Sequence, residues 1–228
     1  MMNYRTSVVR KPLVLLSMRS EFNKYGTQIS SIEHSWFDFL QELFLEPPLI
    51  ILVPNSDFED DYIMQFSPDL VVLSGGNDLT THSQSGDVSE NRDRIETSIL
   101  LKHGNVPILG VCRGFQLANE VLGGRLVFNS SHAGSTHEVI IATNFLKKHE
   151  QNSIQVNSYH NWSIPGNGLA SELEPLATSK DDSIESAVHK INPWFFTMWH
   201  PERAEQGESQ RSFVINYARE LINKRDIN

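Results

Sequence analysis

Short apolar runs alternate with longer amphipathic segments along the first half of the chain. We expect four of these runs to be strands, at 13–18, 49–53, 70–76 and 106–111. Between the first two, apolar residues from Ile32 to Phe44 recur at three- and four-residue spacing, and between the last two Ile95, Ile99 and Leu100 do so, as one buried helix face would. This alternation predicts an α/β fold with three layers, in which helices cover both faces of a mostly parallel central sheet.

The second half of the chain is predicted to be richer in strands. A helix is expected directly after residue 114 and ends at Gly123 and Gly124, and residues 80–91 are expected to form a loop. Further strands are predicted at 137–142, 153–158, 184–190 and 194–200, with a final helix at 209–224. Because no repeat, low-complexity tract or linker interrupts the pattern, we expect a single domain over residues 1–228.

Composition narrows the classes of function. The 228 residues carry 28 acidic against 19 basic side chains, a net charge of −9 without a clustered basic stripe, so nucleic acid is not an expected partner. The apolar run near the N-terminus is too short for a signal peptide or a membrane span, and the single cysteine, Cys112, cannot form an internal disulfide. We therefore expect a cytoplasmic protein with no membrane contact.

Cys112 lies in the segment GVCRG, with Gly110 and Gly114 two residues to either side. A strand that turns sharply into a helix places its turn residue in a strained conformation, and small neighbours let the chain pass. Free N–H groups at the start of the helix also favour a thiolate. The pattern favours a reactive cysteine over a buried structural one.

A second motif, MWHPER, ends the last predicted strand. His200 and Glu202 are two residues apart, so their side chains leave the same face if strand geometry continues. With Cys112 they form a Cys-His-Glu set, in which the histidine moves a proton and the carboxylate fixes its tautomer. A solvated histidine beside an exposed carboxylate is the plain alternative for this motif alone.

Together, GVCRGFQ, LVVLSGGND and MWHPER resemble the class I glutamine amidotransferases, in particular the γ-glutamyl hydrolase branch, peptidase C26. The resemblance implies a flavodoxin-like sheet with a nucleophile elbow. It also implies that Cys112 is the nucleophile, His200 the general base and then acid, and Glu202 the group that orients the histidine. The reaction is then cleavage of a γ-glutamyl amide through a thioester, which releases glutamate.

The resemblance assigns further site residues. The backbone N–H groups of Gly76 and Arg113 are expected to form the oxyanion hole. The γ-glutamyl group is expected to bind in the segment VNSYHNW and against the elbow helix, and a leaving-group contact is expected just after the triad. The residues concerned are Ser158, Tyr159, His160 and Gln116 for the γ-glutamyl group, and Arg203 for the leaving group.

Among these enzymes, SYHNWSI and MWHPER look most like the γ-glutamyl-CDP-amidate hydrolases, which implies a nucleotide amidate or another γ-glutamyl conjugate of a bacterial surface-polysaccharide pathway as the small-molecule substrate. Two alternatives stay open: a glutaminase subunit that supplies ammonia to a separate synthase, and a catalytically silent binding protein. A synthase partner or a homodimer is compatible with the sequence. No cofactor is expected, and no metal, because His132, His137 and the other histidines show no metal-ligand spacing along the chain.

Overall fold

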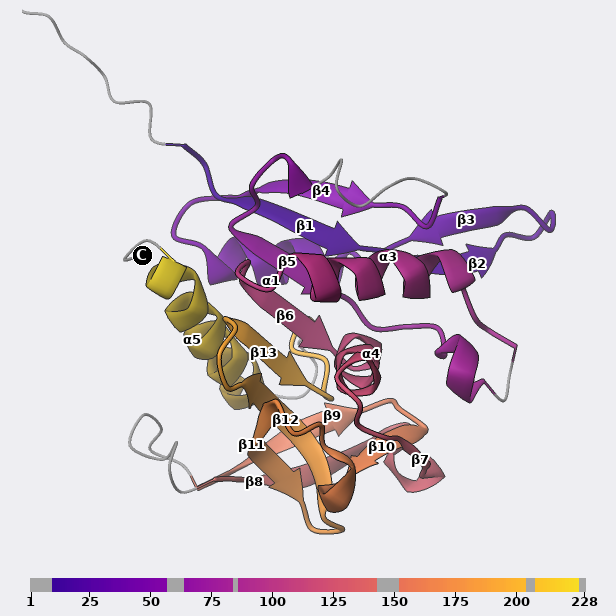
Figure 1. Ribbon diagram of the computed structural model, residues 1–228, viewed down its shortest axis with the longest axis vertical. Coiled ribbons are helices and arrows are strands. Elements are labelled where there is room, and N and C mark those ends of the chain that lie inside the picture. Colours follow the sequence, from indigo (N-terminus) through magenta and orange to yellow (C-terminus); the bar gives the residue numbers. More distant parts are fainter. Residues whose placement is uncertain (1–9, 57–63, 84–85, 143–151, 204–207, 226–228) are drawn as a thin grey trace, which may run out of the picture.

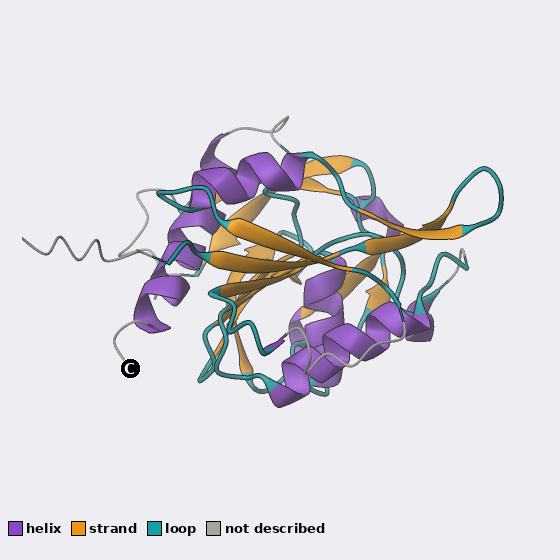
Figure 2. Ribbon diagram, turned by 90° about the horizontal axis from the view of Figure 1, so that it is seen from above, coloured by secondary structure: helices purple, strands orange, loops and turns teal. Residues whose placement is uncertain are grey.

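The computed structural model describes residues 10–56, 64–83, 86–142, 152–203 and 208–225. These residues form a large sheet, a two-stranded hairpin and helices that lie on both sides of the sheet (Figures 1 and 2). The strands are β1 (Leu13–Ser17), β2 (Arg19–Phe22), β3 (Gln28–Ser31), β4 (Leu49–Val53), β5 (Leu70–Leu73), β6 (Ile108–Val111), β7 (Val127–Phe128), β8 (Ser135–Ile141), β9 (Ser153–Ser158), β10 (Trp162–Pro165), β11 (Leu173–Ser179), β12 (Ser183–His189) and β13 (Trp194–Thr197). The helices are α1 (Ser35–Leu43), α3 (Glu90–Lys102), α4 (Arg113–Val121) and α5 (Glu208–Arg225), with short 3₁₀ turns η1 (Thr80–His82), η2 (Ser130–His132) and η4 (Gly166–Gly168).

The central strands are parallel and run in the order β4-β1-β5-β6-β13. Counted along the chain among themselves, this is the order 2-1-3-4-5 of a flavodoxin-like sheet, so the predicted fold class is confirmed. Beyond β13 the sheet continues through β12, β11, β8 and β9 with antiparallel pairing, which is the strand-rich second half. In sheets of this order, ligands bind beyond the carboxyl ends of the parallel strands.

Alternation along β1 explains the three layers. Val14 and Leu16 are buried in one apolar cluster with residues of α1 and α5, whereas Leu15 is buried in a second cluster with residues of α3 and α4. Successive side chains of a strand point to opposite faces, so a strand that is apolar at every position needs a helix layer on each side. No helix in the described part of the chain is both long and apolar enough to span a bilayer.

The structure confirms the predicted strands and helices and adds elements that the pattern did not show. The helix expected from Ile32 begins at Ser35, and the stretch 80–91 contains η1 and the first turn of α3, with 84–85 outside the described residues. The hairpin β2–β3 and the strands β7, β10 and β11 were not predicted. The hairpin is largely polar and lies outside the main sheet, so its side chains carry no burial pattern.

A buried arginine fixes the turn that follows β5. Arg92, fully buried in the first turns of α3, donates hydrogen bonds to the carbonyl oxygens of Ser74 (2.6 Å), Gly75 (3.1 Å) and Gly76 (2.6 Å). Its Nε also pairs with Glu96 at 2.9 Å. One side chain therefore satisfies three successive carbonyl groups at the carboxyl end of a central strand.

Glu96 joins this arginine to the elbow helix. Its second oxygen pairs with the guanidinium of Arg113, the first residue of α4, which also pairs with Asp93. Burial alone would raise the pKa of Glu96, but Arg113 and Arg92 outweigh burial and lower that pKa. Removing one member of such a buried set leaves the other charges uncompensated.

We predict that Arg92→Met lowers the free energy of unfolding by about 3 to 5 kcal/mol, because it leaves Glu96 half-paired and three carbonyl groups without their donor. Urea denaturation with matched m-values measures the change. Arg94→Met on the same helix is the control, since Arg94 is exposed and its replacement should stay within about 0.5 kcal/mol. Equal losses in the two variants would contradict the structural role of Arg92.

Candidate active site

Cys112 stands in a strained turn between β6 and α4. Its backbone has φ 52° and ψ −103°, a conformation that non-glycine residues rarely adopt. The Cys112 N–H donates to the carbonyl oxygen of Thr197 in β13 at 2.8 Å, and the Cys112 carbonyl accepts from the N–H of Gln116 at 3.0 Å. The conformation is held from both sides, as expected of a nucleophile elbow.

The two glycines that flank Cys112 are required by close packing. A Cβ on Gly114 would lie 2.2 Å from the carbonyl oxygen of Leu73, and a Cβ on Gly110 would lie 2.6 Å from the ring of Phe196. Real Cβ atoms do not approach other atoms so closely, so neither position accepts a side chain without displacing the sheet or the helix. The spacing of glycines around Cys112 therefore has the physical cause that the sequence pattern predicted.

His200 follows β13 and lies beside Cys112. A Cβ on Gly75 would lie 2.6 Å from His200 Cε1 and 3.5 Å from Cys112 Cβ, so this glycine lets the two side chains meet. His200 Nδ1 is 2.6 Å from Glu202 Oε1, and the three side chains are buried. The structure thus brings together the predicted Cys-His-Glu set.

The backbone of His200 is fixed by a side chain that the sequence analysis did not single out. Asn157, fully buried at β9, accepts a hydrogen bond from the N–H of His200 at 2.7 Å and donates to its carbonyl oxygen at 3.0 Å. This pair of hydrogen bonds from one side-chain amide to one residue holds the backbone of the histidine in place. Asn157 belongs to the VNSYHNW segment, but the sequence analysis assigned only Ser158, Tyr159 and His160 of that segment to the site.

The charge state of His200 follows from its neighbours. Burial by itself lowers the pKa of His200, but the Glu202 carboxylate and Cys112 outweigh burial and raise the pKa to about 10. The imidazole therefore carries a proton at neutral pH. A protonated histidine beside a cysteine is the resting arrangement of many cysteine nucleophiles.

A cavity of about 380 Å³ opens above these residues at the carboxyl ends of β1, β5, β6 and β13. Of the predicted site residues, those on its wall are Cys112, His200, Gly76, Gln116, Tyr159, His160 and Arg203. Wall residues that the sequence analysis did not assign are Arg19, Asn77, Asp78, Asp87, Phe128, Asn161 and Trp162. The predicted residues therefore converge from distant parts of the chain on one hollow.

Three predicted residues lie outside this wall. Ser158 is fully buried at the end of β9, and Glu202 lies behind His200. The Arg113 side chain points to Glu96 and Asp93, which leaves only its backbone for the expected oxyanion hole. The roles of Gly76 and Arg113 as oxyanion donors stay predictions.

Arg203 is held in place by a partner that the sequence did not reveal. Its Nε and Nη2 donate to the two oxygens of Glu33 at 3.0 and 2.6 Å, and its guanidinium carbon lies 4.5 Å from the centre of the Tyr159 ring. Burial lowers the pKa of Arg203, but the bond to Glu33 outweighs it and raises that pKa. The guanidinium thus keeps its charge at the rim of the cavity, partly balanced by Glu33.

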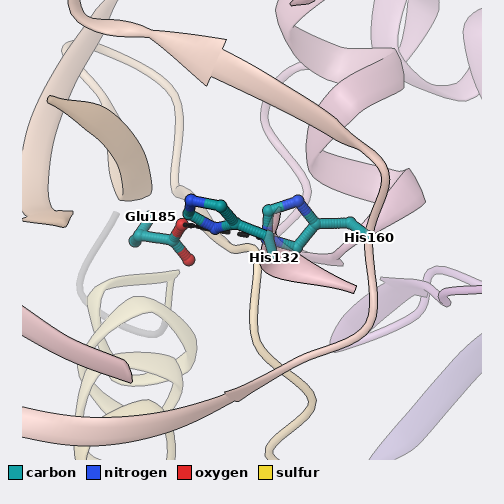
Figure 3. A group of neighbouring side chains, drawn as sticks. All are labelled: His132, His160 and Glu185. Atoms are coloured by element: carbon teal, nitrogen blue, oxygen red, sulfur yellow. Dashed lines mark ion pairs between the residues drawn. The ribbon is translucent and has the colours of Figure 1, made fainter. Parts of the chain in front are cut away.

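Histidines without metal-ligand spacing along the chain come together in the fold, which the sequence analysis did not anticipate. His132, His160 and Glu185 place one ligand atom each within 4.8 Å of one another (Figure 3), and His137 lies against the same carboxylate. They come from η2, the loop before β10, β12 and β8, so their spacing along the chain shows no metal-ligand motif. Among the described residues, His132, His160 and Glu185 are the group whose atoms could hold a metal ion, and His137 lies beside them.

The members of this cluster differ in charge. The contacts of His132 with Glu185 and Asp181 raise the pKa of His132 to about 9, whereas burial lowers the pKa of His160 to about 4. Burial alone would raise the pKa of Glu185, but His132 and His137 outweigh it and lower that pKa to about 2. A fully ionised carboxylate is thus buried among three imidazole rings.

Comparison with known proteins agrees with this geometry. The family model described as glutamine amidotransferase class-I matches residues 30–217. The chain is 36% identical over 135 residues to a γ-glutamyl-CDP-amidate hydrolase of Campylobacter jejuni, which covers 58% of this chain and 62% of that protein, less than two thirds of its length. It is 24% identical over 177 residues to an anthranilate synthase component 2 of Methanothermobacter marburgensis, covering 76% of this chain and 86% of that one.

A solved structure shares the fold. The crystal structure of a putative GMP synthase subunit from Thermoplasma acidophilum superposes with a TM-score of 0.73 and 21% sequence identity, and covers 96% of this chain and 98% of that chain. At this identity the likeness concerns the fold alone. The match of the family model over most of the sequence, together with the elbow and the Cys-His-Glu set, shows that the chain belongs to the class I glutamine amidotransferase family.

Proposed function

We propose that the protein is a cysteine-dependent hydrolase that cleaves the γ-glutamyl amide bond of a small conjugate and releases glutamate. The observation that carries the proposal is the convergence of Cys112, His200 and Glu202 at the wall of one cavity. A binding protein would need neither a strained cysteine nor a histidine clamped by two partners.

The geometry supports a two-step acyl transfer. The Cys112 sulfur attacks the γ-carbonyl carbon, and negative charge develops on the carbonyl oxygen near the Gly76 turn. The C–N bond then breaks as His200 gives its proton to the leaving nitrogen, which leaves a γ-glutamyl thioester. Water attacks the thioester carbon and gives a proton to His200, and the C–S bond then breaks. Glutamate is released, and the Cys112 thiolate beside a protonated His200 is restored. Glu202 holds the ring of His200 in the required tautomer throughout.

For the leaving group we propose a nucleotide amidate such as the CDP-amidate of the Campylobacter relative. Arg19 and Arg203 place two cations at the cavity, where phosphate oxygens could pair with them. Trp162 and Phe128 are packed edge to face at its rim, with ring centres 5.4 Å apart, and offer apolar faces for a base. The same wall carries Asp78 and Asp87, the second of which is 3.8 Å from Arg19, so a phosphate would compete with Asp87 for that cation. The arginines and the aromatic rim together support a nucleotide group over ammonia alone.

A glutaminase subunit that supplies ammonia to a separate synthase is the second candidate. The similarity to an anthranilate synthase component favours it, since that name denotes one component of a synthase. The two candidates share the triad and the thioester and differ in what departs with the nitrogen. Activity on free glutamine that rises only when a partner protein is added would identify the glutaminase.

We expect the purified protein to release glutamate fastest from γ-glutamyl-CDP-amidate in a panel that also holds glutamine and γ-glutamyl-GABA. Cys112→Ala should lower this release by several orders of magnitude and leave the fold intact, because it removes the atom that forms the thioester. Coupled glutamate dehydrogenase follows the product, and circular dichroism checks the fold. Activity that survives in the variant would remove Cys112 from the mechanism, and release from glutamine alone would favour the glutaminase.

The protonation of His200 should depend on the Glu202 carboxylate. The folded pKa of about 10 exceeds the ordinary value of 6.5, so the stabilising contribution of the pair is fully present below pH 6.5 and is lost as the pH rises towards 10. In Glu202→Gln the neutral amide no longer favours the imidazolium. We expect the Cε1–H resonance of His200 in NMR spectra to titrate at a lower pH in this variant than in the native protein.

The free energy of unfolding provides the second readout of this pair. The difference between the native protein and Glu202→Gln should be largest near pH 6 and should narrow as the pH approaches 10. Cys112→Ala is the comparison variant: it keeps the Glu202 carboxylate and removes the other group that raises this pKa, so its own pH-dependent difference from the native protein measures the part due to Cys112. A difference that stays constant with pH would show that Glu202 does not set the charge of His200.

We expect Arg203→Ala to weaken the nucleotide-linked substrate selectively, with KM raised by about ten-fold and γ-glutamyl-GABA little affected, because one charge-assisted bond to phosphate is lost. Arg203→Lys should recover part of the effect. Arg125→Ala, which removes an exposed arginine that is absent from the cavity wall, is the control. Equal losses on both substrates would assign Arg203 to the structure of the site through Glu33 and Tyr159.

A further inference from the structure

The cluster of His132, His137, His160 and Glu185 has no task in the proposed reaction. Its members come from η2, β8, the loop before β10 and β12, respectively. Figure 3 shows His132, His160 and Glu185 side by side. Glu185 is fully buried, and His132 and His160 are 5% and 3% exposed. Buried polar atoms need hydrogen-bond, ionic or metal partners, because burying them without partners costs free energy.

The atoms that face one another lack those partners. His132 Nδ1, His137 Nε2, His160 Nε2 and both carboxylate oxygens of Glu185 are buried without a hydrogen bond among the described residues. Glu185 Oε1 is 3.2 Å from His132 Nδ1, 3.4 Å from His137 Nε2 and 3.7 Å from His160 Nε2. Three ring nitrogens thus surround one carboxylate oxygen without the alignment of a hydrogen bond.

These distances fit donor atoms around one metal ion. Four ligands bound to zinc at about 2.0 to 2.1 Å in tetrahedral geometry lie about 3.3 Å from one another. The three distances from Glu185 Oε1 fall around this value. Because the imidazole rings also lie against one another, with ring centres 4.7 and 4.9 Å apart, a small inward movement would close the set.

The outer nitrogens of two rings are held as they are in metal sites. His132 Nε2 is 2.9 Å from a carboxylate oxygen of Asp181, and His160 Nδ1 is 3.1 Å from the carbonyl oxygen of Trp162. Histidines that bind a metal through one nitrogen donate the other N–H to a carboxylate or a carbonyl group, which fixes the tautomer. In the neutral tautomer that these outer hydrogen bonds select, the inner nitrogens of both rings carry the lone pairs that a metal ion would take.

We propose that His132, His137, His160 and Glu185 bind a divalent transition-metal ion, zinc in the first place, as a closed structural site. Imidazole nitrogens select zinc and its neighbours over magnesium or calcium, and four protein ligands leave no position for a reacting group. The ion joins four segments of the antiparallel sheet. Through His160 it also holds Tyr159 and Asn161 of the loop before β10, and Trp162 at the start of β10, on the cavity wall.

Metal binding is tested on the full chain without any tag and after treatment with a chelator. All proteins carry Cys112→Ala, so that the cysteine and His200 offer no competing site. Titration with Zn²⁺ alone, followed by calorimetry and elemental analysis, should give one ion per chain. Titration with Co²⁺ should give the visible absorption of a tetrahedral ion with nitrogen and oxygen ligands.

Two variants and one control locate the ion. Glu185→Gln should abolish stoichiometric binding, and Asp181→Asn should weaken it by about 10- to 100-fold, because the outer partner of His132 is lost. The Asp181 side chain is 43% exposed, so this variant remains informative if Glu185→Gln does not fold. His34→Asn, which replaces an exposed histidine outside the cluster, should bind as the parent does.

The temperature of unfolding gives an independent readout. Zn²⁺ should raise it in the parent protein and much less in Asp181→Asn, because an ion that binds only the folded state stabilises that state. A folded parent that takes up neither Zn²⁺ nor Co²⁺ stoichiometrically would overturn the proposal, as would binding unchanged in both variants. None of these readouts depends on turnover, so the outcome is separate from that of the proposed hydrolase function.

Discussion

The backbone of Cys112, at φ 52° and ψ −103°, is the constraint on which the rest of the site depends. A conformation of this kind costs about 1 to 3 kcal/mol and persists only where the surroundings fix it. The surroundings are two neighbouring strands: Gly114 packs on the Leu73 carbonyl at the end of β5, and Thr197 of β13 accepts the Cys112 N–H. Because β13 also leads into His200, the same strand register that strains the proposed nucleophile also places its proposed base.

Buried charged side chains connect the elbow at Cys112 to the turn after β5, which carries Gly76. Arg92 donates hydrogen bonds to the carbonyl groups of the turn after β5. Glu96 pairs with both Arg92 and Arg113, and Arg113 begins the elbow helix. The expected oxyanion donors, at Gly76 and Arg113, are thus joined through side chains rather than through the backbone alone. Preorganised donors of this kind need a rigid frame, because their effect depends on position in the transition state.

The parts of the fold that could be predicted are those with a local cause. Apolar runs indicated the strands, three- and four-residue spacing indicated the helices, and Gly110 and Gly114 marked the elbow because two glycines are needed where the chain passes close to its neighbours. The clamp of Asn157 on His200 and the pairing of Glu33 with Arg203 join residues far apart in the sequence. The spacing of residues along the chain does not reveal such contacts. The histidine cluster could not be predicted from the sequence for the same reason.

The position of His160 shows that the parallel and antiparallel halves of the sheet position different parts of the site. Its side chain lies on the cavity wall and also belongs to the cluster around Glu185, whereas Cys112 and His200 follow the parallel strands β6 and β13. Cys112 and His200 are therefore positioned by one set of strands, and part of the cavity wall is positioned by another. Substitutions in the antiparallel half can therefore change the cavity wall without moving the Cys112 sulfur, so that one fold can carry sites of different shape.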